Sequence, residues 1–480
     1  MTFTTLTFLI FFTVVFALYW SLHNRRAQNV LLIIAGYVFY GWWDWRYCGL
    51  MIAASFLDYF VGLGLNKTEA PWKRKLLLTC GLTGNLAMLG FFKYFNFFAE
   101  NFQALAASLG WRVDPITLNV VLPVGISFYT FQTMSYSIDI YRRKMRATTQ
   151  LLEYLSFVSF FPPLVAGPIE RGTHLLPQFF KERLFSFQQA ADGCRQILWG
   201  LFKKMVIADN LAPIVDAAFT NPSAYNGAEL VLATFCFAFQ IYCDFSGYSD
   251  IAIGVAKLLG FELIRNFAYP YFSQSVGEFW RRWHISLSSW FRDYVYFPLG
   301  GSRVSKPRMA FNVMVTFILS GLWHGASWNF LIWGALNGIG VLPDILRPQH
   351  SKRNPSEIPV EQPGAVAIFK VLITFTFICF GWVFFRAQTL GNALLVLERI
   401  GTSFLSAAGG LLGKHDATDG RVFIVLALLV ALEWVKRAHL HPLVFDRWPQ
   451  PARWIGYTVL FWTIVYLGTY GSSTFIYFQF

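Results

Sequence analysis

Long apolar stretches recur from one end of the chain to the other, separated by short polar connections. Most are about 17 to 25 residues long, the length of a helix that crosses the hydrocarbon core of a bilayer. The pattern predicts spans at 4–20, 29–43, 47–65, 76–98, 118–140, 151–168, 190–208, 228–256, 309–342, 364–385, 421–435 and 453–471, of which 309–342 is long enough for two passes. We therefore expect an all-α polytopic membrane protein, a bundle of roughly 11 to 13 transmembrane or re-entrant helices.

Composition and charge agree with a membrane protein. Of the 480 residues, 55% are hydrophobic and 14% are charged, which lies outside the range of soluble globular proteins. The net charge of +13 does not indicate nucleic-acid binding, because Lys and Arg lie in short loops between the spans. Basic clusters at 25–26, 67–75 and 142–146 mark alternate connections as cytoplasmic, which places the N-terminus outside the cytoplasm.

Three stretches differ from plain spans. The prolines of 157–172 break any helix there and leave backbone groups that lipid cannot satisfy, so we expect this segment to be buried in protein or at an interface. The turn formers of 213–225 predict an irregular loop. The small and hydroxyl side chains of 122–144 predict a helix that packs through interhelical hydrogen bonds, with one edge toward a cavity.

One histidine lies where water should be scarce. Residues 316–334 carry no charged side chain and have His324 near their centre. An ionisable group at that depth costs several kcal/mol unless it faces a polar cavity or a partner. On a helix, Thr316, Ser320 and Ser327 fall with His324 within an arc of about 80°, which predicts the wall of a water-filled cavity. The alternative is a core histidine that is hydrogen-bonded to a neighbouring helix.

Two carboxylates also lie at membrane depth. Asp244 and Asp250 flank a glycine in the apolar segment 235–256. They either orient the histidine or a substrate hydroxyl, or pair with arginines of adjacent loops to hold the bundle together. Tyr242 and Ser246 could add hydrogen bonds to either arrangement.

The segment 278–295 predicts one amphipathic helix, lying at an interface or lining a funnel. His284 falls at about 240° on the helical wheel, between the apolar and polar faces, where an imidazole can lean into a cavity. Glu278 and Arg282 form an i,i+4 pair that supports the helix.

Arginines on the polar face of the same segment are candidates for binding the phosphates of a donor. Arg281 and Arg292 are the first choice, and Arg282 follows because Glu278 engages it. The alternative is that they are ordinary surface or lipid-headgroup charges.

The chemistry open to the two histidines is limited by what surrounds them in sequence. A zinc site needs three or four ligands, and no third His or Cys keeps a recognisable spacing with His284 and His324, so we expect no metal. Residues 325–329 read GASWN, which is not a serine-hydrolase elbow. Burial favours a neutral imidazole, which can take a proton from an attacking hydroxyl, and this fits acyl transfer by general-base catalysis.

Long motifs carry a family resemblance. The stretches IYCDFSGYSDIAIG (241–254), NFAYPYFSQSVGEFWRRWHISLSSWFRDYVYFPLGG (266–301) and SGLWHGASWNFLIWG (320–334) resemble the membrane-bound O-acyltransferase (MBOAT) family. LPVGISFYTFQTMSYSIDIYRR, FFPPLVAGPIER and the closing FIYFQF are similar to its bacterial alginate O-acetyltransferase, or AlgI-like, branch.

The resemblance implies a single integral membrane domain over 1–480, with scaffold helices in 1–116, a catalytic core in 117–342 and further helices in 343–480. The bundle would surround a central funnel or tunnel, with acetyl-CoA as a donor that approaches from the cytoplasm and no tightly bound cofactor. His324 in LWHG would be the catalytic base, and His284 in RRWH the second motif histidine. Asp244, Ser320, Tyr242 and Trp323 would support or orient them.

The same resemblance implies that acetyl is passed across the bacterial inner membrane to a periplasmic protein that O-acetylates an exported polysaccharide. Alginate is the first expectation, and cellulose or peptidoglycan the alternatives. The residues alone leave two rivals open, which are a polysaccharide or lipid-intermediate transporter without chemistry and an anchor for a periplasmic complex. The loops 101–117 and 400–420, which could meet a partner, match no motif.

Overall fold

The computed structural model describes residues 1–111, 113–114, 117–118, 121–346, 364–404, 418–445, 448–471 and 475–476. Parts of the loops 101–117 and 400–420, and the end of the closing motif, lie outside these residues. The described chain is helical, as the sequence predicts, and contains no strand. It forms two compact units, an N-terminal unit of residues 1–193 and 255–264 and a C-terminal unit of residues 194–254 and 265–480.

The helices of the N-terminal unit follow the predicted spans closely. They are α1 (Leu6–Ser21), α2 (Arg25–Gly41), α3 (Cys48–Lys67), α4 (Pro71–Leu89), a π-helical turn (Gly90–Tyr94), α5 (Phe95–Ser108), α6 (Ile126–Tyr141), α7 (Leu151–Val158) and α8 (Phe161–Leu164). Local signals set several starts. The side chains of Thr5 and Asn24 cap α1 and α2, and Pro71 is the first residue of α4.

The helix α6 forms the core of this unit. Every side chain from Ile126 to Ile140 is buried. Asp58 of α3 accepts hydrogen bonds from Ser137 and from Asn85 Nδ2, the latter at 2.7 Å. The predicted packing through interhelical hydrogen bonds is confirmed. The prolines act as predicted too, since α7 stops at Val158 and only the short α8 follows in a buried segment.

The C-terminal unit contains longer helices around the predicted histidines. They are α10 (Asp209–Thr220), α11 (Gly227–Leu258), α12 (Val276–Arg282), α13 (Ile285–Phe291), α14 (Lys306–His324), α15 (Trp328–Leu346), α16 (Ala365–Arg386), α17 (Leu390–Thr402), α18 (Thr418–Val435) and α19 (Gln450–Leu467). The helix α9 (Phe187–Leu201) belongs to this unit from Cys194 on and continues as the π-helix η4 (Phe202–Ala208), and α11 belongs to it as far as Gly254.

The loop predicted at 213–225 is wrong over most of its length. The helix α10 continues through Pro213 as far as Thr220, and only residues after it are irregular. Its apolar face, which includes Ile214, Val215 and Phe219, is buried. Tertiary packing of that face outweighs the local preference of the turn formers.

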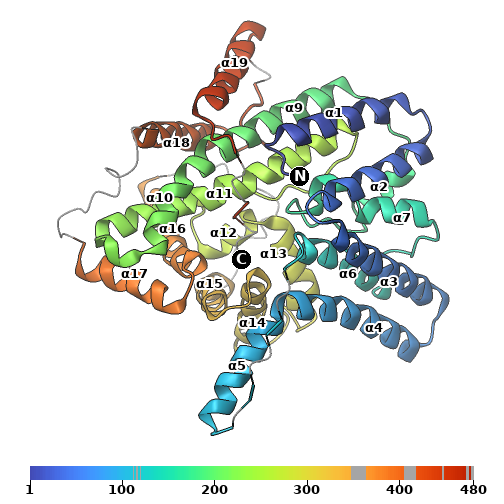
Figure 1. Ribbon diagram of the computed structural model, residues 1–480, viewed down its shortest axis with the longest axis horizontal. Helices are drawn as coiled ribbons and strands as arrows, with labels where there is room; N and C mark the ends of the chain where they lie inside the picture. Colours follow the sequence, from blue (N-terminus) through green and yellow to red (C-terminus); the bar gives the residue numbers. More distant parts are fainter. Residues whose placement is uncertain are drawn as a thin grey trace. The chain divides into compact units, whose positions relative to one another are not determined.

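The predicted double pass at 309–342 is confirmed as two helices, α14 and α15, which lie side by side (Figure 1). Glycines let their backbones approach. A Cβ atom on Gly321 would lie 2.1 Å from the Phe330 carbonyl oxygen, and one on Gly334 would lie 2.4 Å from that of Phe317. Small residues at helix crossings are the usual means of close packing in membranes.

Among the residues that the structure describes, five helical segments are long and apolar enough to cross a membrane, judged by length and composition: Trp45–Lys67, Pro71–Ser108, Gly227–Leu258, Trp328–Leu346 and Ala365–Arg386. The chain is a multi-pass membrane protein. The segment Gly227–Leu258 is 83% buried inside the protein over its most apolar window, so its apolar character reflects the protein core as much as lipid.

We predict that Gly334→Ala destabilises the protein by about 1 to 3 kcal/mol, because the new methyl group forces α14 and α15 apart. Gly456→Ala in α19 is the matched control, since nothing lies within 4 Å of its Cβ position. Thermal unfolding in detergent should show a lower midpoint for Gly334→Ala alone. Equal midpoints for wild type and Gly334→Ala would contradict the close helix contact.

Candidate active site

His324 is the last residue of α14 and is 3% exposed. The chain turns away at once, because Gly325 is extended and a side chain there would meet the Phe330 ring at 2.1 Å. The imidazole packs edge-to-face on the Trp333 ring, at 4.9 Å between centroids, and on the Phe385 ring at 5.3 Å. Aromatic rings from α15 and α16 therefore fix the plane of the His324 side chain.

His284 lies between two short helices rather than inside one long helix. The predicted continuous helix at 278–295 is wrong, because α12 ends at Arg282 and α13 starts at Ile285. His284 has φ +42°, in the left-handed region, and is 0% exposed. The break is held by backbone hydrogen bonds to the neighbouring segment, from Ile285 N to Asn266 O and from Ala268 N to Arg282 O, both 2.9 Å.

Trp323 joins the two histidines. Its ring centroid lies 4.9 Å from that of His324 and 6.0 Å from that of His284. Two residues that are 40 positions apart in the sequence are therefore separated by about one indole ring. The structure brings together His324, His284 and Trp323, three of the residues that the sequence singled out.

Further aromatic side chains form a shell around this group, which we call the aromatic shell: Phe279, Trp283, Trp333, Trp382 and Phe385. Trp333 stacks on Trp382 at 6.0 Å, and Phe279 stacks on Trp283 at 5.4 Å. All five are buried, so the shell keeps bulk water from the imidazoles. Burial lowers the pKa of His284, which lies outside the five apolar segments, because desolvation disfavours the imidazolium.

Ser320 keeps its predicted place one helical turn before His324 and is buried. Thr316 is on the same face, and its hydroxyl donates to Asn312 O at 2.6 Å. Ser327 is not part of this stripe, because α14 stops at His324 and α15 starts only at Trp328. The break at Gly325 therefore shortens the predicted hydroxyl stripe.

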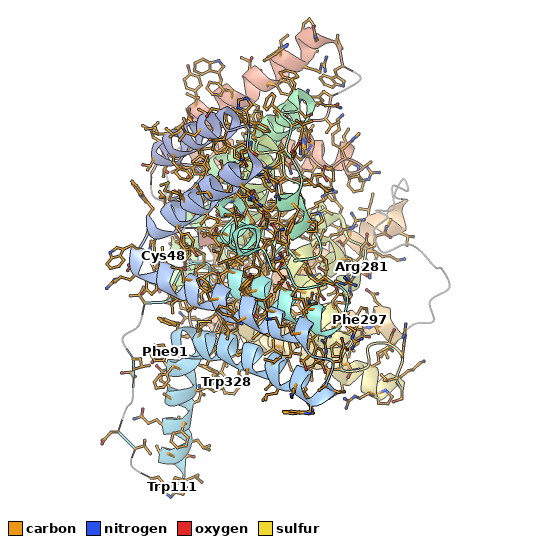
Figure 2. The ribbon with its side chains drawn as sticks, turned by 90° about the vertical axis from the view of Figure 1, so that its right-hand side faces the viewer. Cys48, Phe91, Trp111, Arg281, Phe297 and Trp328 are labelled. Atoms are coloured by element: carbon orange, nitrogen blue, oxygen red, sulfur yellow. The ribbon has the colours of Figure 1, made fainter. Side chains whose placement is uncertain are left out.

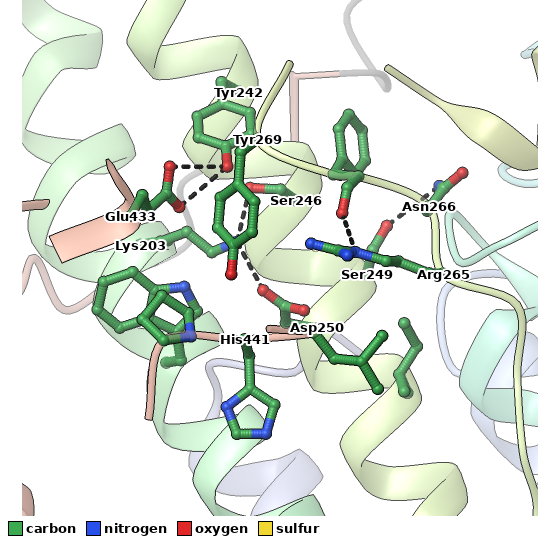
Figure 3. Close-up of a pocket in the computed structure, with 15 residues that line it drawn as sticks. Lys203, Tyr242, Ser246, Ser249, Asp250, Arg265, Asn266, Tyr269, Glu433 and His441 are labelled. Carbon is green, nitrogen blue, oxygen red and sulfur yellow. Dashed lines mark hydrogen bonds and ion pairs between the residues drawn. The ribbon is translucent and has the colours of Figure 1, made fainter. Parts of the chain in front are cut away.

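Tyr242 packs against the aromatic shell through the ring of Trp283. Its ring is 6.2 Å from that of Trp283, and its hydroxyl donates to Glu433 of α18 at 2.9 Å. Lys203 of η4 lies over the Tyr242 ring and pairs with Asp250 at 2.6 Å. Figure 3 shows these side chains around a small polar pocket. Glu433 is absent from the sequence prediction, since it sits near the end of an ordinary apolar span.

The principal contacts of Asp244 are with residues other than His284 and His324. Its carboxylate pairs with Lys204 Nζ at 2.7 Å and accepts a hydrogen bond from Ile476 N at 2.8 Å. Lys204 also pairs with Asp209 at 2.7 Å. The geometry matches the alternative in which the carboxylate holds the bundle together, with a lysine of η4 in place of the expected loop arginine.

The three candidate donor-binding arginines differ in their surroundings. Arg282 is buried and pairs with Glu278 at 2.6 Å. Arg292 is exposed and bonds to Asp293 at 2.9 Å. Arg281 is exposed (Figure 2). Of the three, Arg281 and Arg292 are exposed, whereas Arg282 is buried and engaged by Glu278.

Within the described residues, no three His, Cys, Asp or Glu side chains gather as a metal site would require. The groups that converge here are two imidazoles in an apolar enclosure with hydrogen-bonding partners at its edge. Such an arrangement suits proton transfer to or from a hydroxyl substrate.

Comparison with known proteins points to one family. The family model described as MBOAT, membrane-bound O-acyltransferase family, matches residues 141–385, which include both histidines and Trp323. The chain is 40% identical over 399 residues to a probable alginate O-acetylase AlgI of Azotobacter vinelandii, covering 82% of this chain and 76% of that protein.

Two other relatives extend the comparison. Identity is 38% over 436 residues to a probable alginate O-acetylase AlgI of Pseudomonas aeruginosa, covering 89% of this chain and 81% of that protein. A peptidoglycan O-acetyltransferase of Helicobacter pylori is 36% identical over 401 residues, which cover 78% of this chain and 74% of that protein.

We predict that Lys204→Met destabilises the protein by about 3 to 5 kcal/mol, because it removes the cation from two buried carboxylates. The double variant Lys204→Met/Asp244→Asn should recover part of that loss in a double-mutant cycle. Lys257→Met is the control, since its pair with Asp192 is more exposed and should contribute about 1 kcal/mol or less. Additive effects of Lys204→Met and Asp244→Asn on thermal unfolding would contradict a structural pair.

Proposed function

Because this chain belongs to the membrane-bound O-acyltransferase family, we propose that it takes acetyl groups from acetyl-CoA and delivers them for O-acetylation of an exported polysaccharide. It is an O-acyltransferase and a multi-pass membrane protein. The proposal concerns the donor, the acceptor and the direction of transfer. The observation that carries it is the pair of buried histidines that share Trp323.

The reaction needs a base where water is scarce. In the proposed step, a neutral His324 takes the proton of the acceptor hydroxyl, and the oxygen attacks the carbonyl carbon of the thioester. The C–S bond then breaks, and the CoA thiolate leaves and takes up a proton. His284 positions the hydroxyl or relays that proton, and Trp323 keeps the two imidazoles in a fixed relation.

The aromatic shell supports this role in a second way. Water that reached a bound thioester would hydrolyse it, and the buried rings around His324 limit that side reaction. The phosphates of acetyl-CoA would stay outside the aromatic shell, near the exposed Arg281 and Arg292.

The sidedness of the reaction rests on charge. Basic clusters in alternate loops favour a cytoplasmic donor, a periplasmic N-terminus and insertion in the bacterial inner membrane. Acetyl would then leave on the opposite side, where a periplasmic partner transfers it to the polymer. Alginate is the first choice because two of the relatives are named as alginate O-acetylases, and peptidoglycan is the alternative from the third name. Cellulose stays a further alternative.

We predict that His324→Ala lowers release of CoA from acetyl-CoA by about 10² to 10⁴-fold, the usual contribution of a general base. The measurement uses the purified protein in vesicles, with and without a candidate periplasmic partner. His23→Ala, an exposed histidine, is the matched control and should keep the wild-type rate.

Two results would overturn parts of this proposal. An unchanged rate in His324→Ala would remove that residue from the reaction. No CoA release by wild type, even with its partner, would mean that the donor is wrong. Labelled acyl donors of other kinds would then be compared in the same vesicles.

A further inference from the structure

Asn266 holds the break at which His284 sits. It lies in the segment between α11 and α12 and is 0% exposed. Its Oδ1 atom accepts hydrogen bonds from Ser286 N at 3.2 Å and from Ser286 Oγ at 2.9 Å, and it lies 3.2 Å from Nδ1 of His284. On its other side, Nδ2 donates to Ser249 Oγ at 3.2 Å, in the polar pocket of Figure 3.

These contacts fix which end of the amide faces the histidine. A backbone N–H can only donate, so the atom that faces Ser286 N must be the oxygen. An amide oxygen carries no hydrogen, and the hydrogen of its bond to His284 must therefore come from Nδ1. A neutral imidazole has one N–H, so its second nitrogen then carries the lone pair.

We infer that Asn266 is a positioning residue that holds His284 as the Nδ1–H tautomer and leaves Nε2 as its basic nitrogen. The inference deepens the proposed acyl transfer and rests on it for its catalytic meaning. Asn266 is not among the site residues predicted from the sequence, and it lies 18 positions before His284. Its effect on the reaction is exerted entirely through the imidazole.

Asn266 also stabilises the backbone conformation at His284. A non-glycine residue in the left-handed region is strained, because its Cβ atom lies too close to the following carbonyl oxygen. Asn266 offsets that strain with two hydrogen bonds to residues that follow His284. Its side-chain oxygen accepts from Ser286 N, and its backbone carbonyl accepts from Ile285 N. The imidazole is thereby held edge-on to the Phe245 ring, at 4.6 Å and 86°.

Several charged groups on the elements around His284 are engaged elsewhere, and Arg281 of α12 is exposed. Arg282 and Glu278 pair on α12, and Lys203 pairs with Asp250 between η4 and α11. Asp244 of α11 pairs with Lys204, Glu433 of α18 accepts from Tyr242, and Arg265 donates to Phe267 O. Phe245, Phe267 and Trp323 contact the His284 ring and carry no charge. The Oδ1 atom of Asn266 is an acceptor that faces Nδ1, and we expect it to set the tautomer.

The direct test is the ¹⁵N NMR spectrum of the full chain labelled on histidine, in which the two tautomers give distinct signals. The difference between wild type and His284→Gln assigns the signals of His284. We expect the proton on Nδ1 in wild type and a shift toward Nε2–H in Asn266→Leu, which is similar in size but has no acceptor. A proton on Nε2 in wild type, or no change in Asn266→Leu, would overturn the inference.

The kinetic test uses Asn266→Asp, which keeps an acceptor oxygen and adds a charge. A carboxylate on Nδ1–H stabilises the imidazolium, so the acidic limb of the pH profile of CoA release should move up by about one pH unit or more. Asn266→Leu should lower the rate by roughly 10²-fold through misplacement of the ring. Asn312→Asp, an equally buried asparagine on α14, is the control and should leave the limb in place.

The two tests separate the two claims. Wild-type protein without any CoA release would end the proposed function, yet the NMR spectrum would still decide the tautomer. A pH profile of folded Asn266→Asp that coincides with wild type would show that Asn266 does not act through His284. Thermal unfolding of each variant establishes that it is folded.

Discussion

The close contact between α14 and α15 is the constraint on which the histidine site depends. Gly321 and Gly334 bring two backbones to a separation that excludes a Cβ atom. The turn that joins the helices therefore has little length to span, and it places His324 at the end of α14 directly against Trp333 of α15. A wider separation of the helices would draw the Trp333 ring away from the imidazole and open the enclosure to water.

Much of the fold could be predicted because long apolar runs report directly on spans. The predicted spans at 29–43 and 76–98 begin a few residues late, because they did not use the cap Asn24 of α2 or Pro71 at the start of α4. The burial of His324 in a special environment could also be predicted, because placing an ionisable residue inside an uncharged stretch costs free energy. What periodicity could not reveal is where a helix breaks. The pattern of 278–295 continues smoothly through His284, and the break is held by hydrogen bonds that Asn266 accepts from Ile285 N and Ser286 N and that Ala268 N donates to Arg282 O.

Residues that act through distant partners were the hardest to find. Glu433 meets Tyr242 across 191 positions, and Asp244 meets the backbone of Ile476 across 232. No local pattern encodes such pairs, because each depends on how the helices pack. The two lysines of η4 illustrate this. Lys203 and Lys204 look like the basic end of a span, but both are buried and pair with Asp250 and Asp244 of α11.

The left-handed backbone at His284 also restricts how this site can change over time. Among residues with a side chain, Asn, Asp and His tolerate a positive φ best, whereas β-branched residues are strongly disfavoured there. A new residue at this position must therefore first be compatible with the left-handed backbone, and only then does the chemistry of its side chain matter. The fold itself favours replacement by another short side chain that can form hydrogen bonds, so the backbone narrows the set of catalytic groups that evolution can sample at this point.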